Sequence, residues 1–337
     1  MLLKQKKITV GAIHESSLQG EPLVCANISP QFPSLRKRRK EHFFKMNNND
    51  IQNKEQTNIK ESKMPPKAAC VHDLAGFGRC SFSVILPTLA CMGVQPCAIP
   101  TAVLSTHTGG FTGFTFLDFT EHIEDYYKHW IELDVKFDAF YSGFLGSFRQ
   151  IELVEDMIKG FGYPKTILVD PVMGDDGFLY STYTEEMREG MKSLVKKATV
   201  ITPNITEASF LLDVPCRDYS VGEKDKLFDI AKRLGEFGPD MITVTGINSE
   251  NSVATVCYDK AKGEPVIIEN ERVPKSYPGT GDIFASVLLG ELLRERTLEH
   301  SCEKACSFVH DIIEYSRQFD YPVREGVLLE SLLYKLL

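Results

Sequence analysis

Residues 68–100 read AACVHDLAGFGRCSFSVILPTLACMGVQPCAIP, and this stretch indicates the fold class. Two short apolar runs, 68–72 and 95–100, have the length of buried strands. Between them, residues 82–92 carry apolar side chains at helical spacing, behind a turn rich in glycine and serine. A strand, a helix and a second strand in this order predict a right-handed βαβ unit with parallel strands.

The same alternation continues along the chain and predicts an α/β fold. We expect further strands at 137–142, 166–170, 199–202, 241–245, 253–258 and 265–269. The expected further helices are 118–132, 148–159, 184–196, 205–212, 223–237, 281–294 and 298–315. This order predicts a central, mostly parallel sheet with helices on both faces, in which ligands bind beyond the carboxyl ends of the strands.

Composition narrows the class of protein. The 337 residues are 43% hydrophobic and 25% charged, which is ordinary for a globular protein. No apolar stretch has the length of a membrane span, and no signal peptide is recognisable. The nine cysteines are scattered without CxxC or zinc-ligand spacing, so we expect a reducing, cytoplasmic location.

Charge divides the chain into two parts. Residues 1–66 carry 12 Lys and Arg against 6 Asp and Glu, whereas the remainder carries 26 against 40. The first part is polar and low in complexity, which predicts a disordered basic extension over 1–66 and a folded domain over 67–337. The run LRKRRK at 35–40 is either a solvated charge run or an address signal. The acidic domain argues against nucleic acid as a partner and suits an enzyme acting on a small molecule.

The sequence PGTGDIFAS at 278–286 places an acid, Asp282, behind Gly279, Thr280 and Gly281 at the start of an apolar helix. One interpretation is a helix cap, since an acid in the first turn satisfies free N–H groups. Capping does not explain the two glycines, which allow close approach to an anion at the helix N-terminus. Phosphoryl transfer explains all of them: N–H groups stabilise the phosphate while the acid orients the attacking hydroxyl.

Polar residues follow other predicted strands. Asp73 lies in a small-residue turn after the first strand, where either a ligand contact or plain turn chemistry explains it. The segment STHTGG at 105–110, with His107, Thr108 and Gly109, is typical of a flap over a small polar ligand. Asp170, in DPVMGD, ends a buried strand, where an unpaired carboxylate is costly, so we expect it to face a metal or ligand.

A further polar pair starts the predicted helix 205–212. Asn204 and Glu207 stand three residues apart in TPNITEAS. This spacing fits a reciprocal cap between side chains and backbone, which is the stronger interpretation of the motif taken alone. The alternative is that both hold water around Mg²⁺ beside nucleotide phosphates.

Together, PGTGDIFAS, TPNITEAS, DPVMGD and PTAVLSTHTGGF resemble the motifs of the ribokinase-like (PfkB) superfamily, and within it most those of the pyridoxal/pyridoxamine kinases. The resemblance covers residues 68–315 with all four motifs in the same order. It implies a three-layer α/β/α sandwich, ATP and Mg²⁺ as cofactors, a monovalent cation such as K⁺ as a further one, and a homodimer.

The resemblance also implies roles for single residues. Asp282 would be the base that orients the substrate hydroxyl, with Gly279, Thr280 and Gly281 as the anion hole. Asp73, His107, Thr108 and Gly109 would line the substrate ring. The positions implied on the nucleotide side are Asp170, Thr202, Asn204, Glu207 and Thr245, of which Asp170 and Glu207 would serve the metal.

The implied reaction is phosphorylation of the hydroxymethyl group of pyridoxal, pyridoxine and pyridoxamine. Two positions depart from the pyridoxal kinase pattern, which has serine where this chain has Asp73 and lysine where it has Thr245. An acid at the first position also occurs in hydroxymethylpyrimidine kinases of thiamine synthesis, which is the alternative enzyme. Sugar or nucleoside kinases come next, and a catalytically silent binding module is the alternative outside enzymes.

Overall fold

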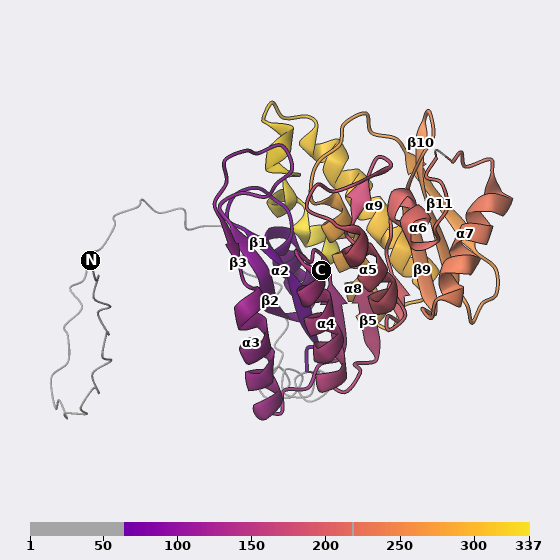
Figure 1. The fold of residues 1–337 in the computed structure, drawn as a ribbon. Helices are drawn as coiled ribbons and strands as arrows, with labels where there is room; N and C mark the ends of the chain where they lie inside the picture. Colours follow the sequence, from indigo (N-terminus) through magenta and orange to yellow (C-terminus); the bar gives the residue numbers. More distant parts are fainter. Residues whose placement is uncertain (1–63, 218) are drawn as a thin grey trace, which may run out of the picture. The chain divides into compact units, whose positions relative to one another are not determined.

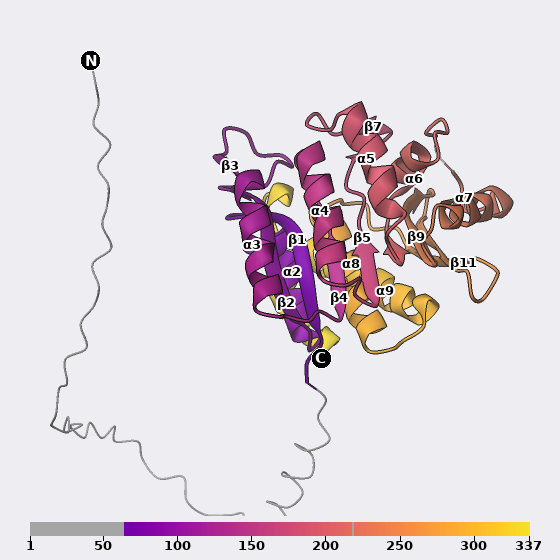
Figure 2. The ribbon, with the colours of Figure 1, turned by 60° about the horizontal axis from the view of Figure 1, so that its bottom comes forward.

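The computed structural model describes residues 64–217 and 219–337, which form a sheet between two layers of helices (Figures 1 and 2). Nine strands of this part make the sheet, in the order β11-β10-β9-β8-β5-β4-β1-β2-β3. Their bounds are β1 Lys67–Ala75, β2 Gln95–Leu104, β3 Phe116–Asp118, β4 Ala139–Ser142, β5 Thr166–Val169, β8 Val200–Ile201, β9 Met241–Asn248, β10 Ser252–Asp259 and β11 Val266–Glu271.

Strand direction follows the prediction. The six strands from β9 to β2 in this order run parallel, and antiparallel pairing is confined to the edges, where β3 joins β2 and where β10 and β11 follow β9. The carboxyl ends of the parallel strands therefore meet along one edge of the sheet. A separate small hairpin, β6 Gly174–Asp175 and β7 Phe178–Leu179, follows β5.

Two hydrophobic clusters of the described residues show how the helices cover the sheet. One cluster joins the sheet to side chains of α3 Thr120–Glu132, α4 Phe148–Gly160, α5 Glu185–Val195, α6 Ile205–Leu211 and α7 Lys224–Glu236. The other joins the opposite face to α2 Phe82–Cys91, α8 Thr280–Leu293 and α9 Leu298–Ser316. This is the predicted three-layer α/β/α sandwich with a mostly parallel sheet.

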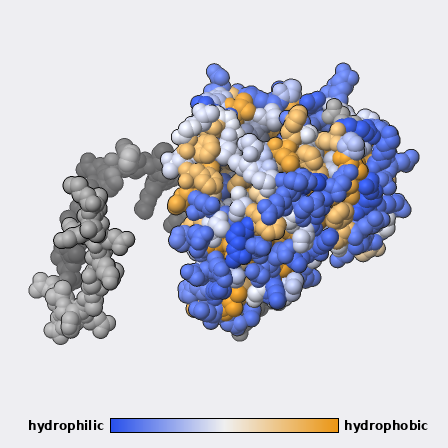
Figure 3. Space-filling model, in the orientation of Figure 1, coloured by the Kyte–Doolittle hydropathy of each residue, from blue (hydrophilic) through white to orange (hydrophobic). Residues whose placement is uncertain are grey.

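The α8 helix is the most deeply buried helix of the second layer. Every residue from Asp282 to Glu291 is buried, which explains why its sequence is apolar all round. The outer helices α4, α5 and α7 instead carry an apolar stripe against the sheet and charged residues outside. The face shown in Figure 3 is accordingly mostly hydrophilic, with apolar groups in separate patches.

The structure differs from the predicted elements in three places. The helix predicted from residue 118 begins at Thr120, because Asp118 belongs to β3 and its carboxylate accepts a hydrogen bond from the Thr120 N–H at 2.8 Å. The β6–β7 hairpin lies in the segment 171–183, where the sequence predicted neither a strand nor a helix. Three 3₁₀ turns follow α9, at Val323–Glu325, Leu329–Ser331 and Leu333–Leu336.

The predicted extension lies outside the described residues, apart from residues 64–66, which precede β1 without regular structure. None of the helices in 64–217 and 219–337 combines the length and the apolar character that a membrane span requires.

Candidate active site

The start of α8 lies open at the edge of the sheet. Gly279, the residue before the helix, has a φ of 80°, and a Cβ there would lie 2.3 Å from the carbonyl oxygen of Arg79. Only glycine fits such a position. Gly281 is exposed, and a Cβ built on it would meet nothing within 4 Å. The helix tip therefore has free space in front of its first N–H groups, which lack intrahelical acceptors.

Asp282 does not cap this helix. The N-cap position is Gly279, which has no side chain, and Asp282 stands in the first turn. The carboxylate instead accepts hydrogen bonds from the N–H of Ser81 at 2.7 Å and from the thiol of Cys80 at 3.5 Å, both in the loop between β1 and α2. The capping interpretation of Asp282 is thus wrong, and the acid is held by a different part of the chain.

His72 is the third partner of Asp282, and the sequence analysis missed it. Its Nε2 lies 3.2 Å from Oδ1 of Asp282, and its Nδ1 lies 2.8 Å from Oδ1 of Asp73. The ring is buried and packs so close to Gly143 that a Cβ there would lie 2.1 Å from the imidazole Cδ2. One histidine thus joins two of the predicted site acids.

The charges explain the protonation of this group. Burial opposes a charge on His72, but the negative charges of Asp282 and Asp73 and their hydrogen bonds outweigh burial and raise its pKa to about 10. Burial likewise would raise the pKa of Asp282, yet the positive His72 and the hydrogen bonds to Ser81 and Cys80 lower it below its ordinary value. These directions favour an imidazolium paired with a carboxylate at neutral pH.

A local irregularity accompanies this arrangement. The pairing of β1 with β2 shifts register between His72 and Leu74, where one residue of β1 faces two of β2, so the extra residue of the bulge lies on β2. Neighbouring residues of a regular strand point to opposite faces of the sheet. His72 and Asp73 are adjacent in β1 and nevertheless contact each other, through Nδ1 and Oδ1 at 2.8 Å. The only sequence signal for His72 is its position directly before Asp73, in VHD.

Asp170 follows β5 and lies buried beside Thr202. The Thr202 hydroxyl donates a hydrogen bond to Asp170 at 2.9 Å. Burial, and after it the negative charge of Asp282, raise the pKa of Asp170 to about 7, although the Thr202 hydrogen bond and the positive His72 oppose this. Asp170 has no ion-pair partner among the described residues. Asp170 and Thr202, each predicted for the nucleotide side, are thus in direct contact.

Asn204 and Glu207 form a complete capping box at the start of α6. The Asn204 side chain accepts from the Glu207 N–H at 2.8 Å, and Glu207 accepts from the Asn204 N–H at 2.8 Å. The other oxygen of Glu207 accepts from the N–H of Met173 at 3.0 Å. Burial and the charge of Asp170 raise the pKa of Glu207 well above its ordinary value. The capping interpretation of this motif is confirmed, and it fixes Glu207 close to Asp170.

Thr245 lies in β9 next to Asn204, with which it forms an isolated parallel bridge. Its N–H donates to the carbonyl of Pro203 at 2.9 Å. The structure thus brings together the residues predicted for the nucleotide side on neighbouring strands β5, β8 and β9 and their connections: Asp170, Thr202, Asn204, Glu207 and Thr245.

The loop between β2 and β3 lies beside the helix tip. A Cβ on Gly109 would lie 3.7 Å from the Cβ of Pro278, directly before Gly279. His107 is buried in this loop and engages backbone with both ring nitrogens: Nε2 with the carbonyl of Arg324 at 2.7 Å and Nδ1 with the N–H of Gly109 at 3.1 Å. His107 therefore anchors the loop, whereas Thr108 and Gly109 are exposed.

The segment beyond α9 contacts both the loop between β1 and α2 and the loop between β2 and β3, and sequence reasoning missed it. The N–H of Arg79 donates to the carbonyl of Glu325 at 3.0 Å, and the Arg79 guanidinium pairs with Glu330 at 2.9 Å. The carbonyl of Arg324 is the partner of His107. No motif marks this segment, because its contribution is made largely by the backbone.

Comparisons with known proteins identify relatives of this chain. The profile of the family described as Phosphomethylpyrimidine kinase matches residues 86–324. A protein of Bacteroides thetaiotaomicron, assigned provisionally as a phosphomethylpyrimidine kinase and solved with pyridoxal, has a similar structure: TM-score 0.77, 39% identity, 81% of this chain and 96% of that chain covered.

Two curated relatives are similar in sequence. The pyridoxine kinase of Bacillus subtilis is 29% identical over 201 residues, which are 57% of this chain and 70% of that protein. The chloroplastic thiamine biosynthetic bifunctional enzyme TH1 of Arabidopsis thaliana is 27% identical over 233 residues, 69% of this chain; the match spans only 43% of that longer protein. With the family profile matching well over half of its length, this chain belongs to the phosphomethylpyrimidine kinase family and is a kinase with the ribokinase-like fold.

Proposed function

We propose that this kinase transfers the γ-phosphate of ATP to the hydroxymethyl group of a B6 vitamer: pyridoxal, pyridoxine or pyridoxamine. The observation that carries the proposal is the placement of Asp282. An acid that leaves its own helix uncapped, lies beside an open glycine tip and is held ionised by a histidine has the properties of a group that orients an alcohol.

Asp282 acts on the substrate hydroxyl by position. Its lowered pKa makes it a weak base. A weak base suffices in phosphoryl transfer, because the transition state is loose and the hydroxyl need not lose its proton early. The N–H groups at Gly279, Thr280 and Gly281 then stabilise the charge on the transferred phosphoryl group, aided by the helix dipole.

The nucleotide phosphates would bind along the ends of β5, β8 and β9, where Asp170, Thr202 and Thr245 lie. Asp170 and Glu207 are buried acids without an ion-pair partner among the described residues, so an anionic nucleotide beside them requires a cation. Hard carboxylate oxygens fit Mg²⁺, which would neutralise phosphate charge when bound.

The mode of Mg²⁺ binding follows from the ligands present. No group of three or more metal-ligating side chains is found in residues 64–217 and 219–337, and Glu207 already accepts two backbone hydrogen bonds. Asp170 and Glu207 therefore fit an ion that keeps most of its water shell and reaches Glu207 through water.

The substrate ring would lie between Asp73 and the loop that His107 anchors. Asp73 has one oxygen on His72, which leaves the other to accept a hydrogen bond from the ring substituents. Thr108 and Gly109 are exposed on the loop and can close over the ring. The pyridoxal bound by the Bacteroides relative and the pyridoxine kinase from Bacillus support a B6 vitamer as the substrate.

Hydroxymethylpyrimidine is the second candidate substrate. The name of the matching family and the acid at Asp73 favour it. Both substrates are small aromatic nitrogen heterocycles with a CH₂OH arm, so the phosphorylation site would be the same.

The test is a phosphorylation panel with ATP and Mg²⁺ on pyridoxal, pyridoxamine, pyridoxine, hydroxymethylpyrimidine and ribose, run with the intact protein and with Asp282→Asn. We expect turnover of the three B6 vitamers and a loss of roughly 10²- to 10⁴-fold in kcat for the variant. Turnover of hydroxymethylpyrimidine alone would refute the vitamer assignment. Full activity of Asp282→Asn would refute the role of Asp282, and no turnover of any substrate would favour a silent binding module.

A further inference from the structure

His72 stands between the two halves of the proposed substrate site. One ring nitrogen contacts Asp73, on the side of the substrate ring, and the other contacts Asp282, on the side of the reacting hydroxyl, at 2.8 and 3.2 Å. These contacts are shielded from solvent, since all three side chains are at least nine-tenths buried. The distance between the two acids is therefore fixed by the width of one imidazole.

Packing holds the ring from its remaining sides. Gly143, after β4, leaves room for the imidazole edge that any larger residue would occupy. Phe82 of α2 and Tyr141 of β4 contact the ring at centroid distances of 6.1 and 6.4 Å. A ring held this way has little freedom to rotate, so its two nitrogens point in fixed directions.

The charged and titratable groups around His72 come from every neighbouring element. Asp73 belongs to β1 itself, Asp282 to α8, Tyr141 to β4, Cys80 to the loop before α2, and Asp170 follows β5. Burial, followed by the charges of the nearby acids, raises the pKa of both Cys80 and Tyr141 well above the ordinary values. His72 is thus the one positive charge among these groups.

We propose that His72 is a positioning residue of the kinase reaction: an imidazolium that links the ring-binding acid Asp73 to Asp282 and holds the Asp282 carboxylate in place for the substrate hydroxyl. This inference rests on the proposed role of Asp282. It goes beyond that role because it makes a second residue, His72, responsible for the orientation and the ionisation of Asp282.

Two consequences follow for catalysis. Without His72 the Asp282 carboxylate keeps only its contacts with Ser81 and Cys80, so its orientation toward the hydroxyl is less restricted. Its pKa then rises, because burial acts without the opposing positive charge. Activity should therefore be lost on the acidic side of the pH profile first, while binding of ATP changes little.

The test uses two variants that each keep one of the two contacts. The amide nitrogen of Gln can take the position of Nε2 and donate to Asp282, whereas that of Asn can take the position of Nδ1 and donate to Asp73. We expect kcat to fall roughly tenfold in His72→Gln and roughly a hundredfold in His72→Asn. In both, the acidic limb of the kcat profile moves to higher pH. The matched control is His310→Asn, on α9, which should leave kcat and the profile unchanged.

Histidine NMR of the unmodified protein tests the same idea without relying on the folding of a variant. We expect the His72 ring to be doubly protonated at pH 7 and to titrate far above an ordinary histidine. A neutral His72 ring at pH 7 would overturn the proposal. An unshifted acidic limb in both folded His72 variants, with Asp282→Asn still inactive, would overturn it as well. Full activity of Asp282→Asn would instead reject the proposed function itself.

Discussion

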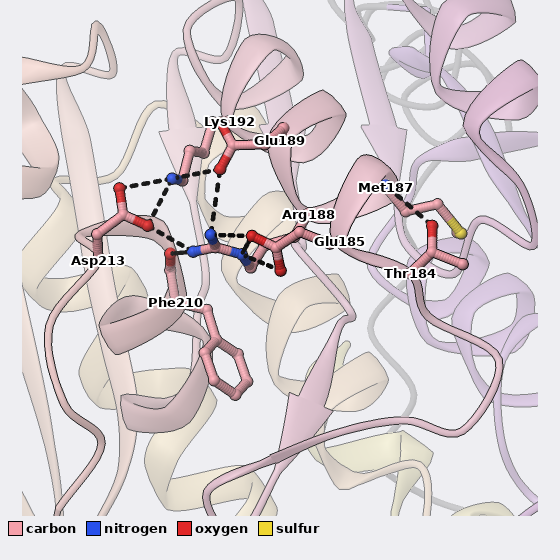
Figure 4. Close-up of polar contacts among 8 residues, drawn as sticks. All are labelled: Thr184, Glu185, Met187, Arg188, Glu189, Lys192, Phe210 and Asp213. Carbon is pink, nitrogen blue, oxygen red and sulfur yellow. Dashed lines mark hydrogen bonds and ion pairs between the residues drawn. The ribbon is translucent and has the colours of Figure 1, made fainter.

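Two regions of this molecule concentrate charge in opposite ways. Arg188 and Lys192 of α5, whose side chains are only 16% and 11% exposed, meet the exposed acids Glu185, Glu189 and Asp213 in a surface network shown in Figure 4. Lys192 lies 2.7 Å from Glu189 and 2.6 Å from Asp213, and Arg188 also donates to the carbonyl of Phe210 at 2.9 Å. Every acid of the network has a basic partner, and its carboxylates remain exposed.

The carboxyl edge of the sheet has the reverse balance. Four buried acids, Asp73, Asp170, Glu207 and Asp282, lie along this edge, and the buried basic side chain His72 contacts two of them, Asp73 and Asp282. Hydrogen bonds to the surface bases lower the pKa of Asp213, whereas burial raises the pKa of Asp170 and Glu207.

The difference indicates what each region is for. Balanced surface charges cost little desolvation and contribute modestly to stability. Buried acids in excess cost free energy, and a fold keeps them when a ligand or a cation supplies the missing positive charge. The comparison therefore predicts that substitutions at the sheet edge lower activity strongly, and that replacing a buried acid there can raise stability. Substitutions in the surface network should leave activity unchanged and alter stability only slightly.

After Asp282 itself, the largest effect is expected at the two glycines before it. Gly279→Ala forces a φ of 80° on alanine and drives its Cβ into the carbonyl of Arg79, so both stability and kcat should fall; the conformation alone costs about 1–2 kcal/mol. Gly281→Ala meets open space, so the fold should be unchanged. Its methyl group enters the space in front of the helix tip, and kcat should fall roughly tenfold to a hundredfold.

Urea unfolding and steady-state kinetics on both variants check this pair. If Gly281→Ala kept its full kcat, the open tip would not be the phosphate site, and the contrast between the two regions would lose its main support.

Asp170→Asn should make the protein more stable and less active. The pKa of Asp170 is raised to about 7 in the folded protein from an ordinary 3.8, so between these values the folded state holds a proton that the unfolded state has released. Its contribution to stability therefore decreases as pH rises from about 4 to 7 and is lowest above 7. The amide removes this cost while keeping an oxygen for the Thr202 hydroxyl.

Unfolding free energies at pH 5 and pH 8, without nucleotide or Mg²⁺, measure this effect. We expect the gain in stability of Asp170→Asn over the unmodified protein to be larger at pH 8, together with a kcat lowered roughly tenfold or more. If Asp170→Asn were less stable than the unmodified protein at pH 8, the Asp170 carboxylate would have a stabilising partner, as the acids of the surface network do.

The fold could be predicted from the sequence because its signals are local. Apolar runs of strand length alternate with helical spacing, and the predicted strand at 95–100 and helix at 82–92 correspond to β2 and α2. The short strand β3 escaped prediction because its three residues are exposed and carry no alternation. Asp118 was given to the following helix since an acid is common at a helix start.

The site could be predicted only where a motif encodes it. Asp282 and its glycines, Asp170 and the Asn204–Glu207 pair each follow a strand or begin a helix in a recognisable pattern. His72 was missed because a regular strand would direct it away from Asp73, and their contact has no sequence signature here. The carbonyl of Arg324 was missed because any residue supplies a backbone carbonyl.

The smallest effect is expected in the surface network. Arg188→Met keeps the aliphatic stem of the side chain but removes the guanidinium that contacts Glu185, Glu189 and Asp213. Lys192 still pairs with Asp213, so the melting temperature should fall by a few degrees at most, and less in high salt, where exposed charges are screened. Lys128→Met, which breaks the exposed pair with Glu124, is the matched control and should lower it less, since Arg149 still contacts Glu124. Thermal unfolding at low and high salt and kcat at saturating substrates provide the measurements. A drop in kcat for Arg188→Met with an intact fold would mean that the network acts on the sheet edge, and the two regions would then have to be treated as one.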